Sequence, residues 1–384
     1  MNFSLTEEQA AIRELARQIL TDACTPARLT ELEANASGDG IDRSLWAALG
    51  EAHLLGIDID ESDGGSGLGF GALCVLVEEA GRVIAPIPLV PTLICGAAAI
   101  GQFGTDAQKK KWLPGIAAGE TLLSAGLQEV GRFDPTCPQT RARSDGDRWI
   151  LDGEKVCVPC AKSAARILLP ASLGEGRVGV FLVDPEAEGV RLEEAVANNH
   201  ERQFQLSLSG VEVSADDVLG DPQTGAGIIQ WVADRAQVAL AALQLGVCQA
   251  AVEKTAEYTS DRKQFGRPIG TFQAVTMRIA DAYVDLECMK STLWQAIWRL
   301  EEGLPAGAES AATKWWACRG GSRVAHTAMH LHGGIGADID YPIHRHLLWA
   351  QQIGLTLGGA GEQLARIGAL HAESDTGAPA DVSP

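Results

Sequence analysis

Residues 261 to 274 carry the densest set of side chains suited to binding a phosphorylated, planar ligand. Two guanidinium groups (Arg262 and Arg267), the ring of Phe265 and the carboxamide of Gln273 lie close together in this stretch. Arginine pairs with phosphate oxygens and stacks on flat rings, so this combination is typical of a nucleotide-cofactor site. The same residues also allow an ordinary turn whose arginines face water.

The local sequence predicts where these groups are held. Gly266, Pro268 and Gly270 separate two long segments with helical apolar spacing, and glycine and proline end helices. The stretch is therefore predicted to be a turn between two helices.

Composition limits the ligands and partners of the chain. It has 384 residues, a formal net charge of -19 and a pI near 4.8, which disfavours nucleic acid and anionic membranes as partners. No apolar run approaches a membrane span and the start lacks a signal peptide, so we expect a cytoplasmic protein. Nine cysteines, an odd number, fit reduced thiols better than a disulfide framework.

Cys157 and Cys160 form a Cys-Val-Pro-Cys motif. The spacing fits a redox dithiol or half of a zinc site. No second cysteine pair or histidine pair completes a zinc shell, and no βαβ pattern surrounds the motif. A structural role is therefore the favoured interpretation, and we predict no metal site.

The amino-terminal part, residues 1–122, is predicted to be helical. Thr6 followed by Glu7 and Glu8 is typical of a helix start, and apolar residues then recur at helical spacing. Further helices are predicted at about 42–54, 70–82, 92–103 and 106–118.

Residues 123–222 are predicted to form an antiparallel β domain, because their apolar runs are short and separated by turn dipeptides. These are Asp145-Gly146, Asp152-Gly153 and Ser209-Gly210. The strongest hairpin signals are at Gly146 and Gly153.

Residues 223–372 are predicted to form a four-helix bundle, so the fold class is α+β. The helices are predicted at about 228–259, 271–302, 307–332 and 344–371, the last with a break near 357–361. Their apolar faces are too extensive for a monomer. The small, polar residues 373–384 predict a disordered tail.

A helical part, a β domain and a four-helix domain in this order resemble the acyl-CoA dehydrogenase family. The stretch from Arg262 to Gln273 is similar to the cofactor turn of that family. His330-Leu-His332-Gly333-Gly334-Ile-Gly336 is similar to its glycine pair after the third bundle helix. The resemblance covers nearly the whole chain.

The resemblance implies an FAD shared between two subunits. Arg262 would meet the pyrophosphate, Phe265 would pack at the adenine side, and Gln273 would bond the linker. His330, Gly333 and Gly334 would approach the nucleotide closely. The family removes two hydrogens from an acyl-CoA thioester, and a separate electron-transfer flavoprotein usually accepts the electrons.

The sequence departs from the family pattern on the flavin side. The flavin loop usually reads Thr-Glu-Pro-Gly followed by small residues, but here it reads Leu127-Gln-Glu129-Val130-Gly-Arg-Phe133-Asp. The tryptophan-centred segment that flanks the flavin corresponds to Cys157-Val-Pro159.

The catalytic base of the family is also missing. Its usual Tyr-Glu-Gly-Thr segment corresponds to Thr356-Leu-Gly-Gly359, which has no carboxylate. The alternative position falls near Ala236, with Asp234 the closest acid but about 200° away around the helix. Glu362 reaches the site only if the glycine run unwinds. We therefore predict that neither Asp234 nor Glu362 is the base, and we assign no catalytic residue to this chain.

These departures suggest the degenerate subunit of an α2β2 acyl-CoA dehydrogenase. Paired enzymes of this kind act on steroid side chains in bacteria, so the resemblance implies a bulky acyl-CoA and a homologous partner subunit. Two alternatives stay open: a competent homotetramer with a displaced base, and a family member recruited to other flavin chemistry.

Overall fold

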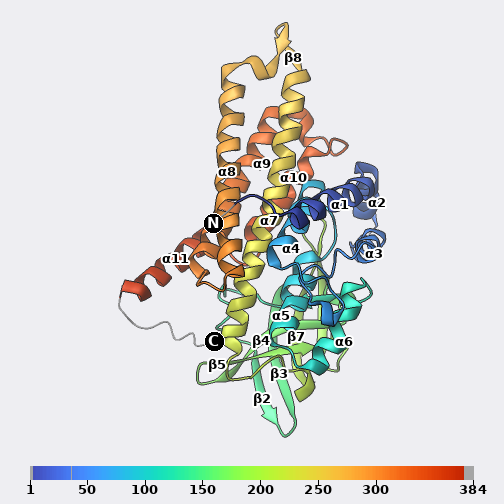
Figure 1. Ribbon diagram of the computed structural model, residues 1–384, viewed down its shortest axis with the longest axis vertical. Coiled ribbons are helices and arrows are strands. Elements are labelled where there is room, and N and C mark those ends of the chain that lie inside the picture. The colour runs from blue at the N-terminus through green and yellow to red at the C-terminus, as the bar shows by residue number, and fades with distance from the viewer. Residues whose placement is uncertain (1–2, 36, 376–384) are drawn as a thin grey trace.

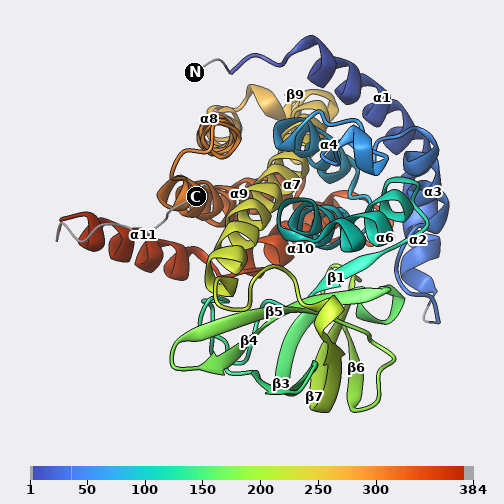
Figure 2. The ribbon, with the colours of Figure 1, turned by 60° about the horizontal axis from the view of Figure 1, so that its bottom comes forward.

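The computed structural model describes residues 3–35 and 37–375 (Figure 1). Helices from both ends of the chain lie against one β-sheet formed by the middle of the chain. Figure 2 shows α7 (Gly225–Asp261) running between the amino-terminal helices and the other bundle helices, with the sheet below them. This is the helical, β and four-helix arrangement that the sequence predicted. The domain limits at residues 122 and 222 stay predictions.

The amino-terminal part is helical, and its first helix begins where predicted. The Thr6 hydroxyl accepts a hydrogen bond from the Gln9 backbone N–H at 3.2 Å, and Gln9 Oε1 accepts one from the Thr6 backbone N–H at 3.1 Å, so the capping box is complete. The segment predicted at 92–103 is π-helical over its first part. The elements are α1 (Glu7–Ala23), α2 (Pro26–Ala34), α3 (Arg43–Glu51), η1 (Glu61–Asp63), α4 (Phe70–Val83), η2 (Val90–Ala98), α5 (Ala99–Phe103) and α6 (Asp106–Ala117).

The middle of the chain forms a seven-stranded sheet in the order β1-β4-β2-β3-β7-β6, with β5 paired to β4. Most neighbouring strands are antiparallel, as predicted, but β1 and β2 both run parallel to β4. The strands are β1 (Leu123–Ala125), β2 (Arg141–Asp145), β3 (Arg148–Pro159), β4 (Arg166–Gly174), β5 (Arg177–Val183), β6 (Val190–Val196) and β7 (Arg202–Ser214).

One of the three predicted turns in the sheet is a hairpin and two are not. Gly146 turns β2 into β3, as predicted. Gly153 lies inside β3 and Gly210 inside β7, so the hairpins predicted there are wrong. The pairing of β3 with β7 shifts between Leu151 and Gly153, which marks a β-bulge. A bulge needs the same left-handed glycine as a tight turn, and Gly210 has a φ of 64°.

The carboxy-terminal part contains the predicted long helices, of which α9 (Gly307–His332) has the predicted bounds. The predicted break in the last helix lies between α10 (Ile343–Leu355) and α11 (Ala360–Asp375). Helix α11 runs past residue 373, where the tail was predicted to begin, and residues 376–384 of that tail lie outside the described residues. The other elements are β8 (Lys263–Gln264), β9 (Arg267–Pro268) and α8 (Gln273–Glu301).

Helix α7 corrects the expectation that no segment is long enough to cross a membrane. Among the described helices of sufficient length, it alone is apolar enough by composition to do so. However, 78% of its most apolar stretch is buried inside the protein. This burial is typical of the core helix of a globular protein.

A buried ion pair holds the loop between β1 and β2. Glu129 Oε1 accepts hydrogen bonds from Lys155 Nζ at 2.6 Å and from the Thr140 hydroxyl at 2.7 Å, and Lys155 is fully buried. Burial lowers the pKa of Lys155 to about 8, although the Glu129 carboxylate opposes this shift. Leu127 and Gln128 of the same loop line a largely apolar cavity, so this pair helps to shape that cavity.

We predict that Glu129→Gln lowers the free energy of unfolding by about 3–5 kcal/mol, because the Lys155 ammonium would stay buried without a carboxylate. Adding Lys155→Met should restore more than half of this loss. Urea unfolding of the purified chain measures both effects. Glu212→Gln, which removes an exposed pair with Arg148, is the control and should cost about 1 kcal/mol or less. Unchanged stability of Glu129→Gln would contradict the proposed role of the pair.

Candidate functional site

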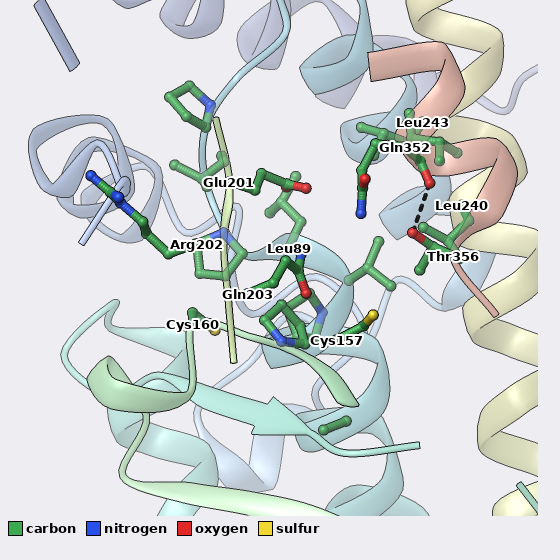
Figure 3. Close-up of a pocket in the computed structure, with 18 of the residues that line it drawn as sticks. Leu89, Cys157, Cys160, Glu201, Arg202, Gln203, Leu240, Leu243, Gln352 and Thr356 are labelled. Carbon is green, nitrogen blue, oxygen red and sulfur yellow. Dashed lines mark hydrogen bonds between the residues drawn. The ribbon is translucent and has the colours of Figure 1, made fainter. Parts of the chain in front are cut away.

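A cavity of about 290 Å³ lies where the three parts of the chain meet (Figure 3). The segment from Ala85 to Pro91 and the α7 residues Leu240 and Leu243 supply apolar walls. Trp349 and Ile353 of α10 supply another wall. A largely apolar cavity with a few polar groups between domains is the usual form of a small-molecule site.

The β-domain wall of this cavity contains the altered flavin-side segments. Leu127 and Gln128 from the loop after β1 line it, as do Cys157 and Pro159 from the end of β3. Proline has no backbone N–H group, so Pro159 cannot donate a hydrogen bond to a bound ligand. The structure therefore brings both departing segments to one wall.

The two cysteines of the Cys-Val-Pro-Cys motif are not bonded to each other. Cys157 is exposed and Cys160 is buried, and both have left-handed backbones with φ of 53° and 46°. Burial raises the pKa of both thiols, that of Cys160 to about 12, which disfavours the reactive thiolate. The described residues contain no cluster of three His, Cys, Asp or Glu side chains that could hold a metal ion.

The segment at the usual position of the base also reaches the cavity. Thr356 and Leu357 line it, at the break between α10 and α11. Leu357 is left-handed, with a φ of 57°, and its carbonyl accepts a hydrogen bond from Gln363 Nε2 at 3.1 Å. Lys314 Nζ, fully buried, donates to the carbonyl of Ile353 at 2.8 Å at the end of α10. The segment is thus firmly held but presents no carboxylate.

Neither acid considered from the sequence lines the cavity. Asp234 forms an ion pair with Arg366 and accepts a hydrogen bond from Gln230 at 3.1 Å. Glu362 lies in the first turn of α11, beyond the glycine break. The ion pair with Arg366 indicates a structural role for Asp234.

The sequence analysis missed Glu201, which lines the cavity just before β7. Figure 3 shows its carboxyl group pointing toward Gln352 on α10. Its Oε2 accepts a hydrogen bond from Asn199 at 2.9 Å, and burial raises the pKa of the carboxyl group. The only signal in the sequence is a short polar run, Asn198 to Arg202, between two predicted strands.

The predicted nucleotide turn lies at the carboxy-terminal end of α7, as the two-stranded hairpin β8–β9 (Figure 1). Arg262 and Gln273 are exposed there, and the Phe265 ring is 93% exposed with a left-handed φ of 53°. The Arg267 guanidinium lies 4.2 Å from the centroid of the Phe272 ring. All the predicted ligand groups of this turn therefore face outward.

The second predicted motif lies beside this turn. Tyr258, one helical turn before Arg262, stacks on His332 with ring centroids 4.5 Å apart. His330, Gly333 and Gly334 are exposed, and a Cβ atom on either glycine would meet no atom of this chain within 4 Å. The structure thus brings the two motifs to one end of the bundle. Gly333 has a φ of 63°, which favours glycine, whereas neither the backbone nor a neighbouring atom of this chain requires glycine at position 334.

An open cleft of about 1090 Å³ between α8 and α9 continues from this end. His330, Gly333, Arg278 and His326 line it. Arg323 also lines it but is paired with Asp285. Basic side chains beside an open glycine backbone suit an anionic group such as a pyrophosphate.

Comparison with known proteins shows close relatives over the full chain. Models of the acyl-CoA dehydrogenase N-terminal and C-terminal domains match residues 6–120 and 223–371. Acyl-CoA dehydrogenase FadE27 of Mycobacterium tuberculosis is 33% identical, over 97% of this chain and 100% of its own length.

Solved structures agree with this relationship. A variant of the Tcur3481-Tcur3483 steroid ACAD is 45% identical with a TM-score of 0.91, and 96% of this chain and 99% of that chain are covered. The ChsE4-ChsE5 complex from Mycobacterium tuberculosis is 34% identical with a TM-score of 0.91, and 99% of this chain and 100% of that chain are covered.

Proposed function

Because the chain belongs to the acyl-CoA dehydrogenase family, whose members are oxidoreductases acting on CH–CH groups, we propose that it is the base-lacking subunit of a heteromeric enzyme. In this proposal the chain binds the nucleotide end of an FAD across a subunit boundary. A homologous partner subunit holds the flavin ring and carries the base.

The observation that carries the proposal is Leu357, an apolar side chain at the position where the family places its carboxylate. Proton removal from the α carbon of a thioester needs a base, and a leucine side chain cannot act as one. Asp234 forms an ion pair with Arg366, and Glu362 does not line the cavity. The usual position and both alternatives thus lack a free carboxylate in the cavity.

The residues present fit one end of FAD and not the other. Arg262, Phe265, Gln273, His330 and the two glycines are exposed and suited to a pyrophosphate and an adenine. The cavity of the same chain holds about 290 Å³, and a cavity of about 150 Å³ holds one benzene ring, so a three-ring flavin and a thioester do not fit together. When bound, FAD would supply hydride acceptance, and this chain would supply binding and orientation.

The proposed substrate is an acyl-CoA with a bulky acyl group of the steroid side-chain type. The support is the 45% identity to a structure described as a steroid ACAD. A complex of two named chains, ChsE4-ChsE5, supports a partner that is a homologue. We further propose a cytoplasmic location, an α2β2 assembly and an electron-transfer flavoprotein as the electron acceptor.

A second candidate function is a competent homotetramer with a displaced base, and Glu201 favours it. This carboxyl group lies on the wall of the cavity, and burial raises its pKa toward the range of a general base. It lies on the β-domain side, at the start of β7, whereas the position taken by Leu357 lies at the end of α10. A base at Glu201 would have to approach the substrate from a different wall of the cavity than the base of the family does. The base-lacking subunit needs no such change, so it is the favoured candidate.

Purification tests the two candidates directly. We predict that the chain purified alone carries little flavin, and that co-expression with a homologous, base-containing subunit yields about one FAD per heterodimer, because each FAD needs groups from both chains. Flavin absorbance at a known protein concentration measures this. A yellow, active homo-oligomer of this chain would contradict the first candidate.

Arg262→Gln should lower the FAD content of the complex, because it removes a charge-assisted contact worth about 1.5–3 kcal/mol with phosphate oxygens. We expect weaker FAD retention by about tenfold or more on dilution, measured by flavin release. Arg143→Gln, an exposed arginine on β2, is the matched control and should retain FAD normally. Equal retention by both variants would exclude a cofactor contact of Arg262.

Asp234→Asn should leave kcat/KM of the complex within about threefold of the native value, because its carboxylate serves an ion pair and not proton transfer. Steady-state oxidation of an acyl-CoA with an artificial electron acceptor measures this. A loss of about a hundredfold or more would identify Asp234 as a displaced base.

A further inference from the structure

The cavity at the junction of the three parts contains polar groups that no described residue uses. Among the described residues, no donor bonds Glu201 Oε1 and no partner bonds the carboxamides of Gln203 and Gln352. All three side chains are half-buried and line the cavity. Figure 3 shows the Glu201 carboxyl group and the Gln352 carboxamide pointing toward each other across the space. Polar groups that converge in a largely apolar cavity between domains favour a ligand site.

The other charged groups of the cavity wall are already paired. Asp39 accepts hydrogen bonds from Arg43 at 2.9 Å and from Ser163 at 3.0 Å. Arg202 donates to the Asn35 carbonyl at 3.2 Å and lies 3.1 Å from Glu194, and Figure 3 shows its guanidinium pointing away from the cavity. Glu201 is therefore the one charged group of this wall whose charge has no ion-pair partner among the described residues.

The thiols of the wall do not offset this charge. Cys157 and Cys160 are kept neutral because burial raises the pKa of each. Burial likewise raises the pKa of Glu201, which means that its carboxylate lacks a compensating cation in the protein alone. A cationic ligand would supply that charge and form charge-assisted hydrogen bonds to both carboxylate oxygens.

The size of the cavity selects compact ligands. Its volume of about 290 Å³ is roughly twice the ~150 Å³ that accommodates one benzene ring. The walls are formed by proline, leucine, isoleucine and tryptophan side chains, which favour flat or alicyclic hydrocarbon surfaces. The matching ligand therefore has about two rings.

From these observations we propose that this cavity is a binding site for a small bicyclic organic cation, an amine or an amidine, whose N–H groups bond Glu201 and Gln352. The site is distinct from the nucleotide-binding turn at the far end of α7. It neither requires nor excludes the function proposed above. The ligand occupies the space in which a competent family member would place its ring and thioester.

Binding of three isosteric probes to the full-length chain tests this proposal. The probes are 2-naphthamidine (cationic), 2-naphthamide (neutral) and 2-naphthoate (anionic), measured by isothermal titration calorimetry. We expect the amidine to bind at least about tenfold more tightly than the amide, which is the worth of one charge-assisted hydrogen bond. The naphthoate should not bind. Equal affinities for all three probes would overturn the proposal.

Two variants locate the binding. Glu201→Gln should weaken amidine binding by about tenfold or more and leave amide binding within about twofold. Asp39→Asn removes an acid of the same wall that is already paired, and it should change amidine binding by less than about threefold. Equal effects of the two variants would show that the amidine responds to general negative charge and would overturn the proposal.

Two further measurements complete the test. Trp349 lines the cavity, so the amidine should quench tryptophan fluorescence in the native chain and do so less in Trp349→Phe. Quenching that is unchanged in this variant would place the probe elsewhere.

If the chain alone oxidises an acyl-CoA and Glu201→Gln abolishes this activity, Glu201 is a base, and the proposed cation site is wrong.

Discussion

The backbone contact between α4 and α7 fixes the geometry on which the rest of the structure depends. A Cβ atom on Gly246 would lie 1.9 Å from the carbonyl oxygen of Glu78, and one on Gly81 would lie 2.1 Å from that of Leu243. Any side chain at either glycine would push the helices apart. Because α4 belongs to the amino-terminal part and α7 to the bundle, this contact sets their separation. Ala80 and Leu243, which flank it, line the cavity from its two sides.

Helix α7 also separates the cavity from the predicted nucleotide-binding turn. Leu243 lines the cavity and Arg262 follows the end of the helix, so the axial distance between them is about 28 Å at 1.5 Å per residue. The turn is thus displaced from the cavity of its own chain. A ring as exposed as Phe265, held mainly by an edge contact with Phe272 at 6.2 Å, is typical of a surface covered in an assembly. Both features support cofactor sharing between subunits.

The fold was predictable where local signals and tertiary packing agree. The bounds of α9 follow from Pro305 before it and Gly333 after it, which is why the sequence predicts them correctly. Gly153 and Gly210 were misread because a bulge and a hairpin need the same left-handed glycine, and only strand pairing distinguishes them. Pairing between strands that are distant in the sequence cannot be predicted from the residues of one strand alone.

The candidate site likewise contains residues that the sequence indicates and residues that it does not. Arg262 and the Gly333-Gly334 pair stand in sequence motifs, so the sequence singles them out. The structure brings them to one end of the bundle, and their contact with a cofactor stays a prediction. Glu201 was missed because nothing in its short polar run indicates which side chain faces a cavity. The walls around it come from the segments near Pro86, Leu243 and Trp349, which meet only in the folded chain. Cavities built from distant segments are therefore the hardest part to predict.

The break between α10 and α11 supports the proposal that the base is absent through side-chain replacement alone. A left-handed backbone costs a non-glycine residue about 1–2 kcal/mol, yet Leu357 adopts one with no carboxylate to position. The surrounding structure holds this conformation, because Gln363 donates to the Leu357 carbonyl and the buried Lys314 amino group donates to the Ile353 carbonyl at the end of α10. Burial lowers the pKa of Lys314. The left-handed conformation at Leu357 is therefore a feature of the scaffold, and the proposed loss of the base leaves the shape of the cavity and of the Arg262–Gln273 turn unchanged.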